Sequence, residues 1–134
     1  MQILVADDDP VYRSLLQGLL EESHFEVVLA CDGAEAWEVL QRPDAPTLAL
    51  LDWNMPGMEG YEVCRKVRQA KGDSSPYILM VTSNSSREEL LKVLVAGADD
   101  YLLKPFEPLD LKIRLRTAVR ILSLQDRLEL AVIN

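Results

Sequence analysis

The sequence is poor in the residues that build disulfide frameworks and Cys/His metal sites. Its 134 residues include two cysteines, Cys31 and Cys64, and a single histidine, His24. Neither the number nor the spacing of these residues suits a zinc ion or a set of disulfides. We therefore interpret both cysteines as ordinary thiols and His24, which precedes Phe25, as a turn residue.

Long apolar runs are also absent. The apolar runs, such as residues 3–6 and 48–51, are far shorter than the roughly 20 residues of a membrane-spanning helix. The chain reaches Asp7 and Asp8 after a short start without basic residues, which is unlike a signal peptide. We expect a cytoplasmic protein.

Basic residues are outnumbered by acidic ones. The chain has 14 Lys and Arg against 22 Asp and Glu, a formal net charge of −8. Binding to nucleic acid requires a basic footprint, and an anionic membrane surface attracts basic segments. We therefore expect neither nucleic acid nor a membrane as a partner. The length suits one globular domain.

Short apolar segments alternate with helical patterns five times along the chain. We expect strands at residues 3–6, 25–29, 47–51, 77–81 and 101–103. We expect helices that begin at Pro10, that cover residues 34–40, 59–70 and 87–96, and that run from Pro108 or Leu109 to about residue 130. Strands that are apolar throughout and separated by helices predict an α/β fold, a doubly wound parallel sheet covered on both faces.

Polar residues follow four of the five predicted strands. They are Asp7, Asp8 and Asp9 after the first, Asp52 after the third, Thr82 and Ser83 after the fourth, and Lys104 and Pro105 after the fifth. In an open parallel sheet, ligands bind at the carboxyl ends of the strands. We expect these side chains to converge there, except Asp9, which precedes Pro10 and is typical of a helix N-cap.

The chemistry of this set favours a magnesium ion and a phosphoryl group. Asp7, Asp8 and Asp52 would repel one another, and one would stay protonated unless a cation joined them. Mg²⁺ prefers oxygen ligands and often binds one or two carboxylates together with a phosphate. A carboxylate can attack phosphorus to give an aspartyl phosphate, which Thr82 and Lys104 would stabilise.

The same residues, taken in order, resemble the receiver domain of two-component response regulators. The resemblance rests on Asp7-Asp8, on Asp52 in Leu-Leu-Asp-Trp-Asn-Met-Pro-Gly, on Thr82 in Met-Val-Thr-Ser, and on Lys104-Pro-Phe after Gly-Ala-Asp-Asp-Tyr101. It covers roughly residues 2–120. It implies a flavodoxin-like (βα)5 sandwich of five parallel strands in the order 2-1-3-4-5, an order that a chemotaxis member of this family illustrates.

The resemblance also implies roles for individual residues. Asp52 would be the phospho-acceptor, and it would take its phosphoryl group from a histidine kinase or a phosphotransfer protein. Asp8, Asp52 and the main-chain carbonyl of Asn54 would bind Mg²⁺ directly, and Asp7 would bind it through water. The domain would signal rather than act as an enzyme on another substrate, although its site would assist its own phosphorylation and dephosphorylation.

The resemblance also implies which residues contact the bound phosphate and which respond to it. The backbone N–H of Ser83 would contact the phosphate, and the Lys104–Pro105 bond would be cis. Thr82 and Tyr101 would shift together on phosphorylation, which is a population shift between two conformations that changes protein–protein contacts.

The end of the chain leaves two interpretations open. We assign residues 1–122 to the receiver domain and residues 123–134 to an extension of the last helix. Ile121, Leu124, Leu128 and Ala131 follow the spacing of a short coiled-coil seam. The extension is either a frayed end or a stalk that pairs in a homodimer or leads to an output domain outside these residues.

Two other functions would require part of the same set of acidic and polar residues. A phosphatase of the haloacid dehalogenase type also has a nucleophilic Asp and Mg²⁺, but it places a second Asp two residues later, where this chain has Asn54. An interaction module that has lost phosphorylation would lack part of the acidic set, and this chain has all of it.

Overall fold

Five parallel strands form one sheet with helices on both faces. The computed structural model describes the backbone of residues 1–133 and the side chains of residues 1–128. The strands are β1 (Gln2–Ala6), β2 (Glu26–Ala30), β3 (Leu48–Asp52), β4 (Tyr77–Thr82) and β5 (Asp100–Leu103). The helices are α1 (Pro10–Glu22), α2 (Gly33–Gln41), α3 (Gly60–Lys71), α4 (Arg87–Val95) and α5 (Pro108–Ile133), with a 3₁₀ turn, η1 (Gly72–Ser74), after α3.

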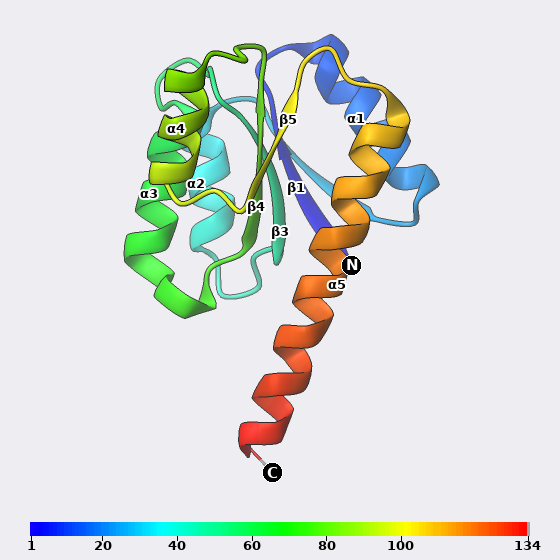
Figure 1. Ribbon diagram of the computed structural model, residues 1–134, viewed down its shortest axis with the longest axis vertical. Helices are drawn as coiled ribbons and strands as arrows, with labels where there is room; N and C mark the ends of the chain where they lie inside the picture. The colour runs from blue at the N-terminus through cyan, green and yellow to red at the C-terminus, as the bar shows by residue number, and fades with distance from the viewer. Residues whose placement is uncertain (134) are drawn as a thin grey trace.

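The strand order is β2-β1-β3-β4-β5, and every neighbouring pair is parallel. This confirms the predicted fold class and strand order. Because every strand runs in the same direction, all five carboxyl ends lie at one edge of the sheet, the upper edge in Figure 1. The predicted elements are all present, and most of their ends lie within one residue of the expected positions.

The sheet separates two apolar layers. The helices α2, α3 and α4 cover one face, and α1 and α5 cover the other (Figure 1). The first core cluster includes Leu4, Leu51 and Met80 from the strands and Val63 and Val67 from α3. The second core cluster includes strand residues of opposite orientation, among them Ile3, Leu50 and Leu79, packed with Leu16 and Leu20 of α1 and Leu111 and Leu115 of α5. Because successive side chains of a strand point to opposite faces, continuous apolar strands fill both layers.

Capping side chains fix where three helices begin. Asp9 accepts a hydrogen bond from the N–H of Val11, as predicted for this N-cap. Asp32 and Ser86 cap α2 and α4 in the same way. His24 has a φ of 68°, which suits the predicted turn between α1 and β2.

Helix α5 continues well past the sheet, as Figure 1 shows. Leu111, Leu115 and Ala118 are buried against the second core cluster, and Ile121 and Leu122 still pack on it. Ile121 therefore belongs to the domain rather than to a free seam. Leu124 and Leu128 are exposed at 46% and 67%, and Ala131 lies outside the residues whose side chains are described.

Burial differs among the apolar residues of α1 and is complete at Cys64. Val11 and Leu15 follow the apolar spacing of α1, yet they are exposed at 73% and 46%, so the buried stripe of this helix is narrower than its apolar pattern. Cys64 is fully buried, and its Sγ donates to the carbonyl of Ala96 at 3.3 Å. Burial raises the pKa of this thiol to about 11.

Gly60 and Gly18 provide a matched test of how the sheet edge is built. A Cβ on Gly60 would lie 2.2 Å from the backbone oxygen of Asp52, whereas a Cβ on Gly18, within α1, would meet nothing within 4 Å. We expect Gly18→Ala to stabilise the fold by about 0.5–1 kcal/mol because alanine favours a helix. We expect Gly60→Ala to destabilise it by about 2 kcal/mol or more through overpacking. Urea unfolding of both variants measures this, and equal stability of the two would contradict the packing described here.

Candidate functional site

Three carboxylates meet at the carboxyl edge of the sheet. Asp7 and Asp8 directly follow β1, and Asp52 is the last residue of β3, the strand next to β1. Each offers a carboxylate oxygen within 4.8 Å of the others. Asp7 and Asp52 are buried, at 1% and 8% exposure, whereas Asp8 is exposed. The predicted convergence of the three acids is therefore confirmed.

Lys104 brings a positive charge to this cluster. Its Nζ lies 3.0 Å from Asp7 Oδ2 and 3.6 Å from Asp52 Oδ1. The ammonium also lies over the ring of Tyr12, 4.1 Å from the ring centroid. The Lys104 side chain is 11% exposed, so its charge is largely shielded from water.

Backbone hydrogen bonds hold the ends of the strands in register. The N–H of Lys104 donates to the carbonyl of Thr82 at 2.8 Å, and the N–H of Trp53 donates to the carbonyl of Val81 at 2.8 Å. The Lys104–Pro105 bond is cis, as predicted. Thr82 is buried at the end of β4, and its Oγ1 accepts from the N–H of Asn84 at 3.2 Å. The residues that directly follow β3 and β5 are thereby held beside β4.

The electrostatics of the cluster are unbalanced without a further cation. Burial, and then the negative charge of Asp7, raise the pKa of Asp52 to about 7, although the charge of Lys104 opposes this. Burial disfavours the charged form of Lys104, but the hydrogen bond to Asp7 and the charge of Asp52 outweigh it and raise its pKa. A lone ammonium thus leaves excess negative charge among the three carboxylates.

The remaining predicted residues lie in β5 or directly after β3 and β4. Asn54 and Ser83 are exposed, each in the segment that follows β3 or β4. Tyr101 lies within β5, is partly buried and packs against the first core cluster. Its backbone oxygen accepts from Arg114 Nε of α5 at 2.6 Å, a contact that links the predicted switch residue to the last helix.

Two residues of α1 belong to the site although the sequence did not reveal them. The ring of Tyr12 faces the Lys104 ammonium. Arg13 NH1 donates to the backbone oxygen of Asp7 at 2.8 Å. Both residues follow Asp8 closely in the sequence and lie at the start of α1, which begins near the carboxyl end of β1. This closeness to Asp8 is the one feature of the sequence that indicates that they lie near the site.

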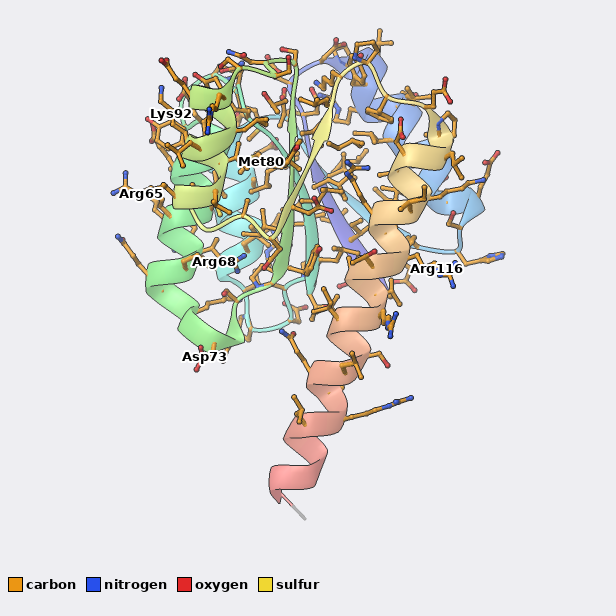
Figure 2. The ribbon with its side chains drawn as sticks, in the orientation of Figure 1. Arg65, Arg68, Asp73, Met80, Lys92 and Arg116 are labelled. Carbon is orange, nitrogen blue, oxygen red and sulfur yellow. The ribbon has the colours of Figure 1, made fainter. Side chains whose placement is uncertain are left out.

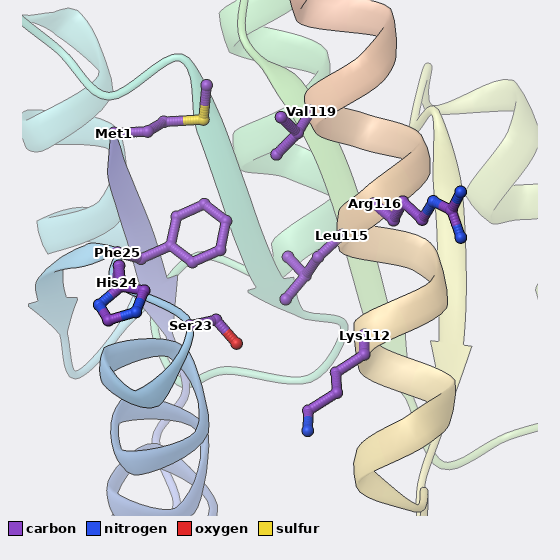
Figure 3. Close-up of a pocket in the computed structure, with 8 residues that line it drawn as sticks. All are labelled: Met1, Ser23, His24, Phe25, Lys112, Leu115, Arg116 and Val119. Carbon is purple, nitrogen blue, oxygen red and sulfur yellow. The ribbon is translucent and has the colours of Figure 1, made fainter.

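Two cavities are lined by residues other than the three carboxylates. One of about 410 Å³ lies at the amino ends of β1 and β2, between Phe25 and Leu115 of α5, with Lys112 at its mouth (Figure 3). Another of about 800 Å³ lies between α3 and α4 and is lined by Trp53, Arg65 and Lys92 among others. Figure 2 shows Arg65 and Lys92 on this outer side of the molecule.

Sequence comparison identifies the family. The family "Response regulator receiver domain" matches residues 3–116. The chain therefore belongs to the response regulator receiver domains, the phospho-accepting domains of two-component signalling, as the sequence predicted.

The chain is similar to named relatives of two kinds. It is 37% identical over 116 residues to a chemotaxis protein CheY homolog of Campylobacter jejuni, which covers 86% of this chain and 89% of that protein. It is 44% identical over 120 residues to the response regulator MprA of Mycobacterium leprae, which covers 90% of this chain and 51% of that protein. The chain thus spans most of the first relative and about half of the second.

Solved structures show the same fold. A putative response regulator from Chloroflexus aurantiacus has a TM-score of 0.82 at 33% identity and covers 89% of this chain and 97% of that one. The receiver domain of the sensor histidine kinase PA1611 of Pseudomonas aeruginosa has a TM-score of 0.80 at 28% identity, covering 88% and 96%. That structure has a magnesium ion coordinated in its active site cleft. Within residues 1–133 of the present chain, no helix is both long and apolar enough to cross a membrane.

The donor set of the cluster fits Mg²⁺. Three carboxylates supply hard oxygen atoms, and no cysteine or histidine lies among them. Charge gives a second reason, because burial and the negative charge of Asp7 both disfavour the ionised form of Asp52, and a divalent cation would favour it.

The raised pKa of Asp52 predicts a pH dependence of stability. Between about pH 4 and 7 Asp52 binds more protons in the folded chain than in the unfolded chain, so without Mg²⁺ its contribution to the free energy of unfolding falls as the pH rises. Asp52→Asn removes this group. Its stability relative to the parent should rise by on the order of 2 kcal/mol between pH 5 and 8.

Urea unfolding of both proteins at several pH values measures this difference. Mg²⁺ added at pH 8 should stabilise the parent more than the variant, because the metal binds the folded state and the variant lacks one ligand. Parallel pH curves for the two proteins would refute the raised pKa of Asp52.

Proposed function

We propose that Asp52 accepts a phosphoryl group, with Mg²⁺ as the cofactor, from the phosphohistidine of a histidine kinase or a phosphotransfer protein. The observation that carries this proposal is the placement of a largely buried Asp52 carboxylate between two further carboxylates and the Lys104 ammonium. A nucleophilic carboxylate, a metal-binding oxygen cluster and a cation for the phosphoryl oxygens are the parts that this transfer requires.

The hydrogen bonds of Asp7 indicate which of the acids would bind Mg²⁺ directly and which would bind it through water. Asp7 Oδ1 accepts from the N–H of Asp9 at 2.9 Å, and its Oδ2 accepts from Lys104. Both oxygens are thus already engaged, which favours contact with Mg²⁺ through water. Asp8 and Asp52 would then bind the ion directly, together with the main-chain carbonyl of Asn54. Bound there, Mg²⁺ would neutralise the charge of the carboxylates and of the transferred group.

The residues of the chain would then perform an in-line transfer. A carboxylate oxygen of Asp52 attacks phosphorus while the P–N bond of the phosphohistidine breaks, and the imidazole leaves with the electron pair. Lys104 pairs with one phosphoryl oxygen. The hydroxyl of Thr82 and the N–H of Ser83 donate to others. In dephosphorylation, water would attack phosphorus while the bond between phosphorus and the Asp52 oxygen breaks, and the Asp52 carboxylate would be the leaving group.

The response would arise at Thr82 and Tyr101. A phosphoryl group adds about −1.5 to −2 charges beside Thr82 and attracts its hydroxyl. Movement of Thr82 toward the site frees space for the Tyr101 ring, which packs on the first core cluster. Because the Tyr101 backbone bonds to Arg114, this shift would reach α5. The output is a population shift that alters contacts with a partner protein or an output domain.

The proposal also covers the domain bounds, the partners and the location of the protein. We assign residues 1–122 to the receiver domain and propose that the extension of α5 mediates a homodimer. The net charge of −8 favours protein partners over nucleic acid. A cytoplasmic location, typical of the family, is part of the proposal. The haloacid dehalogenase alternative has no support, because Asn54 occupies the position of its acid/base residue.

The phospho-acceptor is tested by mass. Incubation with acetyl phosphate and Mg²⁺ should add one phosphoryl mass to the parent chain and none to Asp52→Asn. Lys104→Ala should still bind Mg²⁺ but should be phosphorylated without any change in oligomeric state, because the cation that senses the phosphoryl group is lost. Asp9→Asn is the control, since it keeps the N-cap and should label normally. Full labelling of Asp52→Asn would place the acceptor elsewhere.

The α5 extension is tested by removing residues 123–134. If the extension forms a stalk, the shortened chain should self-associate at least tenfold more weakly in sedimentation velocity. Leu124→Glu with Leu128→Glu should have the same effect, because both side chains are exposed on the proposed seam. Gln125→Glu, an exposed neighbour off the seam, is the control. Equal association of all these chains would identify the extension as a frayed end.

A further inference from the structure

The Lys104 ammonium has a third neighbour besides the two carboxylates. It lies 4.1 Å from the centroid of the Tyr12 ring and over its face, in addition to its contacts with Asp7 and Asp52. The face of an aromatic ring carries negative electrostatic potential and attracts a cation, most strongly where water is excluded. With its side chain 11% exposed, Lys104 satisfies that condition.

The Tyr12 ring also contacts the segment that carries Lys104. Tyr12 belongs to the first turn of α1, and its ring contacts that of Phe106 with 6.1 Å between the centroids. Phe106 follows Lys104 and Pro105 in the segment after β5 and packs on the second core cluster. The ring therefore connects α1 to the segment that carries Lys104, and it is partly buried.

The value of this third neighbour depends on the proposed function, because it concerns the site with Mg²⁺ present. Lys104 would then share the carboxylates of Asp7 and Asp52 with a divalent cation, and the two cations would repel each other. The ring face is not shared in this way, because Mg²⁺ prefers oxygen ligands. Tyr12 is thus the one contact among the three that Lys104 keeps without competition.

We propose that Tyr12 is a positioning residue, whose ring holds the Lys104 ammonium beside Asp52 while Mg²⁺ takes up the carboxylates. The ammonium is then in place for an oxygen of the incoming phosphoryl group. The contribution comes from the ring face and not from the phenolic hydroxyl. Tyr12→Phe keeps the face, whereas Tyr12→Leu keeps apolar bulk without it, and the two variants separate this role from simple packing.

The position of the ammonium can be observed without any phosphoryl transfer. A ring over Lys104 shifts the NMR signals of its ε-CH₂ protons upfield. We expect this shift in the parent and in Tyr12→Phe, both before and after saturation with Mg²⁺, and its loss in Tyr12→Leu. A return of the parent signal to the ordinary lysine position when Mg²⁺ is added would overturn the proposal.

Kinetics give a second, independent readout. With acetyl phosphate, Tyr12→Leu should be phosphorylated about tenfold more slowly, and Tyr12→Phe should be within about twofold of the parent. The dissociation constant of Mg²⁺, measured by calorimetry, should change less than about twofold in both variants. In a Lys104→Met background, Tyr12→Leu should have no further effect, because the cation that it positions is absent.

The outcomes separate this inference from the proposed function. A parent chain that gains no phosphoryl mass contradicts the proposed function, and the NMR comparison then still decides where the ammonium lies. A parent that is labelled normally, together with Tyr12→Leu labelled at the same rate, overturns the role of Tyr12 alone. An equal loss from Tyr12→Leu with Lys104 present or replaced would also overturn it, since that loss would come from packing.

Discussion

Repulsion among three carboxylates that the fold holds together is the constraint on which the rest of this structure depends. Asp7 and Asp8 directly follow β1, and Asp52 ends the neighbouring strand β3, so the backbone keeps the three acids at one edge of the sheet. Burial of Asp52, and then the negative charge of Asp7, raise the pKa of Asp52 to about 7, although the charge of the single ammonium, Lys104, opposes this. The site is therefore built to gain a cation, and the free energy stored in the repulsion favours binding of one that accepts oxygen ligands.

The apolar core makes this arrangement durable. Strands β1 and β3 lie in the middle of the sheet and are buried on both faces, so their carboxyl ends are fixed by packing. Gly60 permits the start of α3 to approach the backbone of Asp52. Backbone bonds then fix the ends of β4 and β5 relative to each other. The functional side chains need little adjustment of their own, because the entropic cost of bringing them together has already been met when the chain folds.

The sequence predicted the fold and most of the site for physical reasons. Apolar runs identify buried strands, and parallel strands bring their ends to one edge, so Asp52 and Lys104 could be expected to meet. Contacts made by side chains of the helices could not be predicted in this way. Periodicity marks Tyr12 and Arg13 as residues of α1, but it does not say that they face the site. It also placed Ile121 on a free seam, whereas the position of the sheet decides that it is covered.

The proton count on metal binding tests the charge imbalance most directly. Calorimetric titration of the parent chain with Mg²⁺, in buffers of different ionisation enthalpy, gives the number of protons released per ion bound. With the pKa of Asp52 near 7, about half a proton should leave at pH 7 and almost none at pH 8.5. Asp52→Asn should release none at either pH. Binding of Mg²⁺ to the parent at pH 7 without proton release would contradict the account.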